Sequence, residues 1–295
     1  MKENVLAKKK NGMAALMGIL LLFAVSVAGI VFGAIAIERH SSSPMLAAGI
    51  VMLVAGIVMV VVSLILLCGL KVLKPQEALV LTLFGRYVGT LKEDGFYFVN
   101  PFCTSFNPAA KTKLSQSGDV SAASMLAAAN GSTTVEAGSN KISLKIMTLN
   151  NNKQKINDCL GNPVEIGIAV TWRVVDTAKA VFNVDNYKEF LSLQCDSALR
   201  DIVRIYPYDV APNVDTTGDG IADEGSLRGS SEIVAGKIRD EIQRRVAEAG
   251  IEIVEARITY LAYAPEIAAV MLQRQQASAI IDARKMIVDG AVGMV

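Results

Sequence analysis

Two long stretches near the N-terminus contain no charged residue and no strand-like alternation of polar and apolar positions. They run from Met13 to Ile37 and from Met45 to Leu70. A helix of about 25 residues is roughly 37 Å long, which exceeds the roughly 30 Å hydrocarbon core of a bilayer. Inside lipid only helices and closed barrels satisfy every backbone polar group. The two stretches therefore predict two transmembrane helices.

The segment between the two stretches, residues 38–44, is short and polar, so the helices must form a tight hairpin. Small residues recur in both helices, and such residues let helix backbones approach closely. They are Gly18, Ala28, Gly29, Gly33, Gly49, Ala55, Gly56 and Gly69. Because glycine is common in membrane helices in general, a specific helix contact and mere composition both remain open as explanations.

A secretory signal peptide is the alternative interpretation of the first stretch. Lysines precede it, and Ala34-Ile35-Ala36 resembles a cleavage site. The apolar part of a signal peptide is only about 7–15 residues long, however, and this stretch is much longer. The sequence therefore favours a retained helix.

The distribution of basic residues predicts the orientation, because lysine and arginine favour cytoplasmic flanks. The hairpin loop contains only Arg39, which Glu38 offsets. Basic residues instead flank the outer ends of the pair, at Lys8, Lys9, Lys10, Lys71 and Lys74. We therefore expect a multi-pass protein of the cell (inner) membrane, with both ends and the soluble domain in the cytoplasm.

After the second stretch, patterns of strands and helices alternate. Strands are predicted at 77–85, 87–91 and 96–99, at 141–146, where Ile142, Leu144 and Ile146 alternate with polar residues, and at 163–174 and 251–260. Helices are predicted at 176–182, 186–203 and 230–249, and from Pro265 onward. Asp176 is the expected N-cap of the first of these helices, and Gly250 ends the third. The fold class is α+β.

Residues 107–140 have a different character, with many small and polar residues and no periodicity, so we expect an inserted loop with a short helix near 124–129. Residues 215–223 resemble the start of a calcium loop. Thr217 stands at the third ligand position, and Ser226 stands where a closing glutamate belongs. A solvated acidic turn is the better interpretation, and no metal site is expected.

Composition excludes several classes of protein. The net charge is +1, which gives no field for nucleic-acid binding. The four cysteines form no C-x-x-C pair, and His40 is the single histidine. A disulfide framework, a zinc site and histidine-dependent catalysis are therefore not expected, and a reducing compartment fits. Sequence signatures of hydrolases, nucleotide-binding loops and metalloproteases are missing, so we expect no enzyme and no cofactor.

Several strings, taken in order, resemble the SPFH family, also called Band 7, which includes stomatin, prohibitin, flotillin and HflK/C. The strings are Pro75–Ala78, Gly95–Phe98 with Asn100-Pro101, Gly161–Ile166, Trp172–Ala180, Ala198–Arg200, Ala249–Ile253 and Tyr260–Ile267 with Arg274–Ala277. The resemblance covers about residues 75–295. Two features depart from the family pattern, namely the long 107–140 insertion and a hairpin anchor where HflK/C-like members have one spanning helix.

The resemblance implies a two-lobed α+β domain followed by a long helix through which many copies assemble into a ring or cage on the membrane. It gives five expected parts: a cytoplasmic flank 1–12, a transmembrane hairpin 13–70, a first lobe 71–185 with the 107–140 insertion, a second lobe 186–262, and an oligomerisation helix 263–295. The expected partners are membrane lipids, further copies of the chain, and membrane proteins such as a protease.

The final helix provides the physical argument for assembly. A stripe of mostly small side chains recurs at steps of three or four, at Ala264, Ala268, Met271, Gln275, Ala279, Ala283, Met286 and Gly290. Much of the remaining surface is also apolar, so the helix needs partners on several sides. Packing of the helix onto its own domain is the alternative.

The leading hypothesis is a non-enzymatic integral membrane scaffold that self-assembles and organises a membrane microdomain and its proteins. A regulatory subunit of an ATP-dependent (AAA+) membrane protease, which controls substrate access, is the alternative. A hidden hydrolase would need a nucleophile, and Cys159 and Cys195 have no histidine to activate them.

Overall fold

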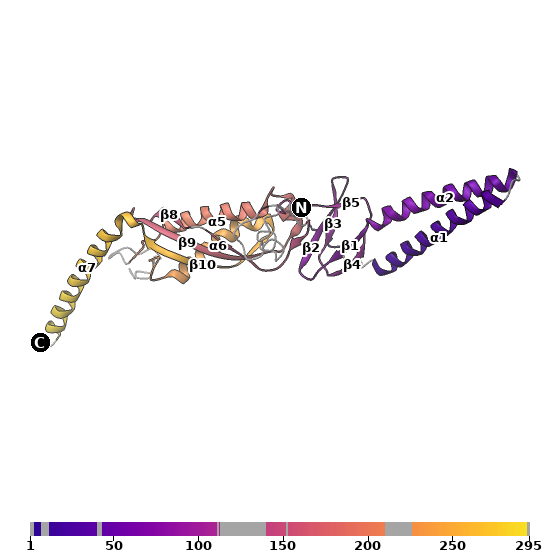
Figure 1. Ribbon diagram of the computed structural model, residues 1–295. Coiled ribbons are helices and arrows are strands. Elements are labelled where there is room, and N and C mark those ends of the chain that lie inside the picture. The colour runs from indigo at the N-terminus through magenta and orange to yellow at the C-terminus, as the bar shows by residue number, and fades with distance from the viewer. Residues whose placement is uncertain are drawn as a thin grey trace, which may run out of the picture. The chain divides into compact units, whose positions relative to one another are not determined.

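The computed structural model describes residues 3–6, 12–39, 43–110, 112, 140–151, 153–209 and 226–293. The chain divides into two compact units. The first contains residues 1–111, 137–145 and 174–185, and the second contains residues 112–136, 146–173 and 186–295. Figure 1 shows two N-terminal helices, a part with mixed strands and helices, and a long C-terminal helix. The mixed α and β composition expected from the sequence is confirmed.

The first unit begins with the helical pair α1 (Gly12–Arg39) and α2 (Ser43–Leu67). Their contact is made by buried residues at seven-residue steps: Ile19, Ser26 and Gly33 in α1, and Gly49, Gly56 and Ser63 in α2. A seven-residue repeat keeps one seam of each helix facing its partner. The two buried hydroxyls donate to the carbonyl three residues earlier in their own helix, so no polar group is left unpaired at the seam.

Glycine is required at this seam because the two backbones nearly touch. A Cβ added at Gly33 would lie 3.0 Å from the backbone nitrogen of Leu53, and one at Gly56 would lie 3.1 Å from the carbonyl oxygen of Ser26. By contrast, nothing lies within 4 Å of a Cβ added at Gly18 or Gly29. Of the two explanations left open by the sequence, a specific helix contact therefore holds at Gly33 and Gly56, whereas Gly18 and Gly29 face away from the partner helix.

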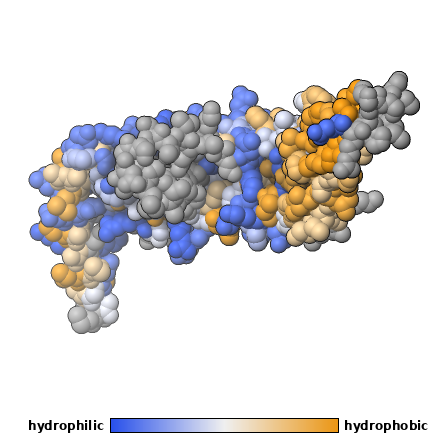
Figure 2. All heavy atoms as spheres, turned by 45° about the vertical axis from the view of Figure 1, so that its right-hand side comes forward, coloured by the Kyte–Doolittle hydropathy of each residue, from blue (hydrophilic) through white to orange (hydrophobic). Residues whose placement is uncertain are grey.

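The outer surfaces of both helices are apolar and exposed. Only 17% of the most apolar window of α1 and 11% of that of α2 are buried. The core helix of a soluble protein would be mostly buried, so this interpretation does not fit. Figure 2 shows the resulting apolar surface over the helical pair. Both helices are long and apolar enough to cross a membrane.

Two small antiparallel sheets follow in the first unit. β1 (Leu70–Leu73) pairs with β4 (Gly95–Phe98), and a second sheet has the order β3 (Arg86–Leu91), β2 (Glu77–Leu83), β5 (Cys103–Ser105), with β6 (Ile142–Ser143) also on β2. Their core contains Leu73, Leu79, Leu81, Leu91, Tyr97 and Cys103. The strands predicted at 77–85, 87–91 and 96–99 are confirmed within one or two residues.

The second unit is built on the long strand β9 (Pro163–Val174), which was predicted with the same bounds. β10 (Ile251–Tyr263) pairs with one edge of β9, and β7 (Met147–Asn150) and β8 (Gln154–Asn157) pair with β9 as well. Helices α5 (Tyr187–Val203) and α6 (Ser231–Val246) pack against each other, and α6 packs on β10. Trp172 is fully buried and meets the ring of Tyr187 edge-on at 6.2 Å.

Two expectations differ from the structure. The strand predicted at 141–146 is only β6, because Ile146 is 58% exposed and β7 begins one residue later. Residues 146–173, placed by the sequence in the first lobe, group with the second unit because β9 pairs with β10 from far along the chain. Pairing between strands that are distant in sequence therefore overrides chain order in the division into units.

The predicted helix ends are confirmed. Asp176 caps α4 (Thr177–Phe182) by accepting a hydrogen bond from the backbone nitrogen of Lys179 at 2.9 Å. Gly250 follows α6 and its short 3-10 extension (Ala247–Ala249) with a φ of 66°, in the left-handed region. Helix α7 (Pro265–Val292) begins directly after β10, with Pro265 at its first position. The predicted short helix near 124–129, the acidic turn at 215–223 and His40 lie outside the described residues.

The glycine seam predicts the effect of two matched substitutions. Gly33→Leu should destabilise the helical pair by about 1–3 kcal/mol, because the side chain would have to overlap the backbone of α2. Gly29→Leu places the same side chain where no neighbour lies, so it should leave the pairing unchanged. Unfolding of the two variants in mixed detergent micelles measures the difference. Equal stability of the two variants would contradict the close contact at Gly33.

Candidate membrane-anchoring and assembly sites

α2 passes into the first sheet with almost no connecting chain. It ends at Leu67, and β1 begins at Leu70. The backbone nitrogen of Val99, just after β4, donates to the carbonyl of Gly69 at 2.9 Å. A side chain at Gly69 would collide with the carbonyl oxygen of Val99. The sheet is therefore held directly against the end of α2 (Figure 1).

The chain before α1 contacts the same unit. Residues 3–6 lie in an extended conformation along β3, with a parallel bridge between Val5 and Thr90. The backbone nitrogen of Thr90 donates to the carbonyl of Asn4 at 2.9 Å, and that of Leu6 donates to the carbonyl of Thr90 at 3.0 Å. β3 is an edge strand of its sheet. The N-terminal segment therefore satisfies backbone groups that an open edge would leave unpaired.

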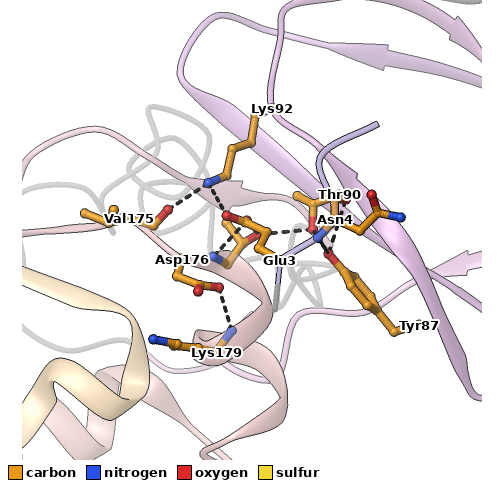
Figure 3. A network of polar contacts seen from close by, with 9 residues as sticks. Glu3, Asn4, Tyr87, Thr90, Lys92, Val175, Asp176 and Lys179 are labelled. Atoms are coloured by element: carbon orange, nitrogen blue, oxygen red, sulfur yellow. Dashed lines mark hydrogen bonds and ion pairs between the residues drawn. The ribbon is translucent and has the colours of Figure 1, made fainter. Parts of the chain in front are cut away.

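Glu3 fixes one end of this segment through several charge-assisted hydrogen bonds. One carboxylate oxygen accepts from the backbone nitrogen of Thr177 at 3.1 Å and from its hydroxyl at 2.5 Å. The other oxygen lies 2.6 Å from Nζ of Lys92, which also donates to the carbonyl of Val175 at 2.7 Å. Figure 3 shows these groups converging from the N-terminal segment, β3 and the start of α4. We call residues 3–6 with these partners the N-terminal clamp.

Burial makes the clamp more than a surface ion pair. The side chains of Glu3 and Lys92 are only 13% and 23% exposed. Thr90 and Thr177 are fully buried, and their hydroxyls are hydrogen-bonded at 3.2 Å. Tyr87 extends the chain of hydroxyls, with its OH 2.8 Å from that of Thr90. Charge-assisted bonds shielded from water are stronger than exposed pairs.

Gly89 allows the segment to lie so close to β3. A Cβ added at Gly89 would lie 2.7 Å from Cγ of Leu6 and 2.9 Å from the carbonyl oxygen of Asn4. Leu6 itself packs against the core cluster of the first unit. The N-terminal clamp therefore combines four features. Gly89 lets the two backbones approach, the edge of β3 is paired, Leu6 makes an apolar contact, and the carboxylate of Glu3 is shielded from water.

The predicted assembly stripe on α7 is divided by the structure. Ala264 is fully buried, and its nitrogen donates to the carbonyl of Pro163 at 2.9 Å. Gln275 donates to Asp209 at 2.8 Å, and Met271 is half-buried. Three of the predicted interface positions are therefore buried or partly buried within their own unit. The stripe remains exposed at Ala268, Ala279, Ala283, Met286 and Gly290.

Several large apolar side chains on α7 are strongly exposed. Ile281, Met286, Ile287 and Val292 are each 65–71% exposed. The helix spans 28 residues, and every residue of its distal half whose burial is described is exposed. A helix that is apolar on several sides is unfavourable in water unless something covers it.

Cys159 and Cys195 are poorly suited to nucleophilic chemistry. Burial, and the charge of Asp196 beside it, raise the pKa of Cys195 to about 12. Burial and the neighbouring Asp158 also raise the pKa of Cys159. All four cysteines are free. Among the described residues, no three His, Cys, Asp or Glu side chains lie close enough together to hold a metal ion.

The basic residues expected to flank the membrane are only partly described. Lys71 lies half-buried on β1, and Lys74 is exposed in the turn after it, whereas Lys8, Lys9 and Lys10 lie outside the described residues. The sequence analysis missed the clamp altogether. Glu3 and Lys92 lie 89 residues apart with no motif joining them. The only local sign was the capping pattern at Asp176, which marked the start of α4.

A comparison with protein families gives one match. A family described as SPFH domain / Band 7 family matches residues 71–287. The matched region begins within β1 and ends inside α7, so it leaves out the whole helical pair. A comparison with characterised proteins finds no match.

The clamp predicts coupling between two distant side chains. Glu3→Ala and Lys92→Ala should each destabilise the first unit by about 1–3 kcal/mol, because each leaves a shielded partner without its hydrogen bonds. The double variant should cost about 1 kcal/mol less than the sum of the two. Native-state hydrogen exchange at the amide of Thr90 measures this, since that amide donates to Asn4.

The pair Glu255 and Arg257 serves as the control, because its side chains are 49% and 75% exposed. Exposed pairs contribute only about 0–1 kcal/mol, so removing either partner should change little. Strict additivity of the Glu3 and Lys92 variants would contradict the clamp.

The raised pKa values predict slow thiol chemistry. A raised pKa means less thiolate at a given pH, so alkylation of Cys159 at pH 8 should be slower than that of free cysteine, whose pKa is about 8.5. Cys195 should react only after unfolding. Mass spectrometry of iodoacetamide-treated protein across pH 7–10 distinguishes the two sites. Rapid alkylation of either thiol at pH 7 would show an activated nucleophile and would contradict this prediction.

Proposed function

Because the chain belongs to the Band 7 family, whose members carry the SPFH domain, we propose that it is a non-enzymatic membrane scaffold. Its helical pair anchors it in the bilayer, and copies assemble through α7 into a ring or cage. The assembly organises a membrane microdomain and the proteins within it. The observation that carries the proposal is the exposed apolar surface of α7 on a chain that also carries two apolar helices.

The clamp supports a hairpin that crosses the bilayer twice. It holds the chain before α1 and the strands after α2 in one folded unit. A bilayer cannot pass between groups that are hydrogen-bonded to one another, so both flanks of the hairpin lie on the same side. A signal peptide cut after Ala36 would detach the segment that covers the edge of β3. These contacts support two retained spans.

The orientation follows from the basic residues and the thiols. Lysines flank the outer ends of the pair, which favours the cytoplasm for the domain. Four free cysteines fit a reducing compartment. The proposed location is the cell (inner) membrane, with the SPFH domain on its cytoplasmic face.

Assembly through α7 is supported by the exposed apolar surface of that helix, which is unfavourable in water. Ile280 and Ile287 lie seven residues apart on one face and are 55% and 71% exposed. Neighbouring copies present the same helix, so lateral packing would bury this face in every copy at once. The half-buried positions near the start of α7 hold the helix to its own unit, and the distal half is left for neighbours.

Substitution on this face tests the proposal. The double variant Ile280→Glu/Ile287→Glu should convert a large assembly into small species, because like charges would replace an apolar contact in every copy. Gln273→Glu/Gln276→Glu adds the same charge at exposed polar positions of the same helix and should leave the assembly intact. Particle imaging after mild detergent extraction shows the size and closure of the assemblies.

The same preparations separate the alternatives. A wild-type protein that remains a lone subunit at all workable concentrations would overturn the proposed assembly. A stoichiometric AAA+ protease in the purified material would instead favour the regulatory role. A pure homo-oligomer supports the scaffold.

A further inference from the structure

The turn between β2 and β3 carries an aromatic residue where turn chemistry disfavours one. β2 ends at Leu83, which pairs with Arg86 at the start of β3, so the turn has two central residues. Phe84 and Gly85 occupy these positions with φ values of 49° and 81°, both in the left-handed region. Such turns strongly prefer Asn-Gly or Asp-Gly, because a bulky side chain is strained at positive φ.

Phe84 is also the most exposed large apolar side chain in the described part of the chain, at 89%. In water, no interaction of an exposed phenylalanine offsets the strain of this backbone position. Asparagine would be favoured there, because it is polar and because it tolerates positive φ. In the described part of the chain, the other non-glycine residue with positive φ is Gln76, which is polar. Phe84 therefore fits an environment that covers it.

A second exposed aromatic residue lies at the same end of the sheet. Phe102 is 59% exposed and precedes Cys103, which pairs with Leu83. It belongs to a rigid turn, because its nitrogen donates to the side chain of Asn100 at 3.1 Å and that of Cys103 donates to the carbonyl of Asn100 at 2.9 Å. Strand register thus brings the two aromatic tips to one edge of the first unit.

The chain segment that leads to Phe102 contacts the end of α2. Val99, three residues before Phe102, is hydrogen-bonded to Gly69 at the end of α2. The tip also carries Arg86, an exposed cation next to the aromatic side chain. Aromatic rings and basic side chains are the groups that favour the interface between lipid headgroups and acyl chains.

We propose that the Phe84–Gly85 turn and Phe102 form an interfacial anchor that seats the first unit in the headgroup layer of the bilayer beside α2. This inference rests on the proposed membrane hairpin and goes beyond it, because it adds a lipid contact made by the sheet. The rings occupy the apolar boundary of the leaflet, and Arg86 stays among the phosphates. The domain is thereby prevented from tilting freely about the exit of α2.

Photo-crosslinking tests the anchor in the full-length protein. The probe p-benzoyl-phenylalanine is placed at Phe84, in vesicles of phosphatidylcholine and phosphatidylglycerol, and adducts are identified by mass spectrometry. Phe32, which is 63% exposed on α1, is the positive control for the spanning helices. Val175 is the negative control, because it is 50% exposed beside Lys92, at the opposite end of β3.

Lipid adducts at Phe84 and Phe32, with none at Val175, are the expected result. Adducts at Phe32 but not at Phe84 would overturn the anchor and leave the hairpin standing, whereas no adduct at Phe32 would overturn the hairpin itself. Crosslinks from Phe84 to a second copy would show an interface between copies and would also overturn the anchor.

The substitution Phe84→Asn separates the lipid contact from folding. Asparagine suits the left-handed turn, so the melting temperature should stay the same or rise. With the probe at Phe102, the yield of lipid adducts should fall severalfold in this variant, because the paired aromatic tip no longer holds the edge in the leaflet. An unchanged yield would contradict joint insertion of the two tips.

Discussion

Residues 3–6 and residues 70–73 lie on opposite sides of the apolar hairpin in sequence, yet the same folded unit holds both. Backbone pairing along β3 and the shielded carboxylate of Glu3 fix the first, and the bond between Val99 and Gly69 fixes the second. A hairpin tied at both ends cannot splay at its base. The seam of glycine and serine residues then keeps the two helices together along their length. The membrane end of the protein depends on this double attachment.

Exposed apolar surface is the feature that links the structure to the proposed function. It occurs on the outside of α1 and α2, along the distal half of α7 and at the aromatic tips of the first unit. Water disfavours each of these surfaces. The lipid bilayer covers the first and the third in the proposed arrangement, and neighbouring copies cover the second. In the proposed arrangement the first unit carries the lipid-facing surfaces and α7 carries the self-associating surface, as a membrane scaffold requires.

Periodicity was sufficient wherever a segment was long and one of its faces was buried. The helices α5 and α6, the strand β9 and the caps at Asp176 and Gly250 appear in the structure as predicted. Short elements escaped detection because two to four residues carry no period: β1, of which only Leu70 falls in the second apolar stretch, was not predicted, and neither was β5. The segment around Ile146 alternates in sequence, but no partner strand continues there, so the alternation did not produce a strand.

By itself, the sequence determined the two apolar spans, the order of the major elements and the family, because these depend on local composition and on spacing along the chain. Only the tertiary structure decided which glycines face the partner helix, that 146–173 belongs with the second unit, and that Ala264 lies inside it. It also revealed the clamp and the strained position of Phe84. These features arise from contacts between residues that are far apart in the chain or from backbone angles, and neither leaves a pattern in neighbouring residues.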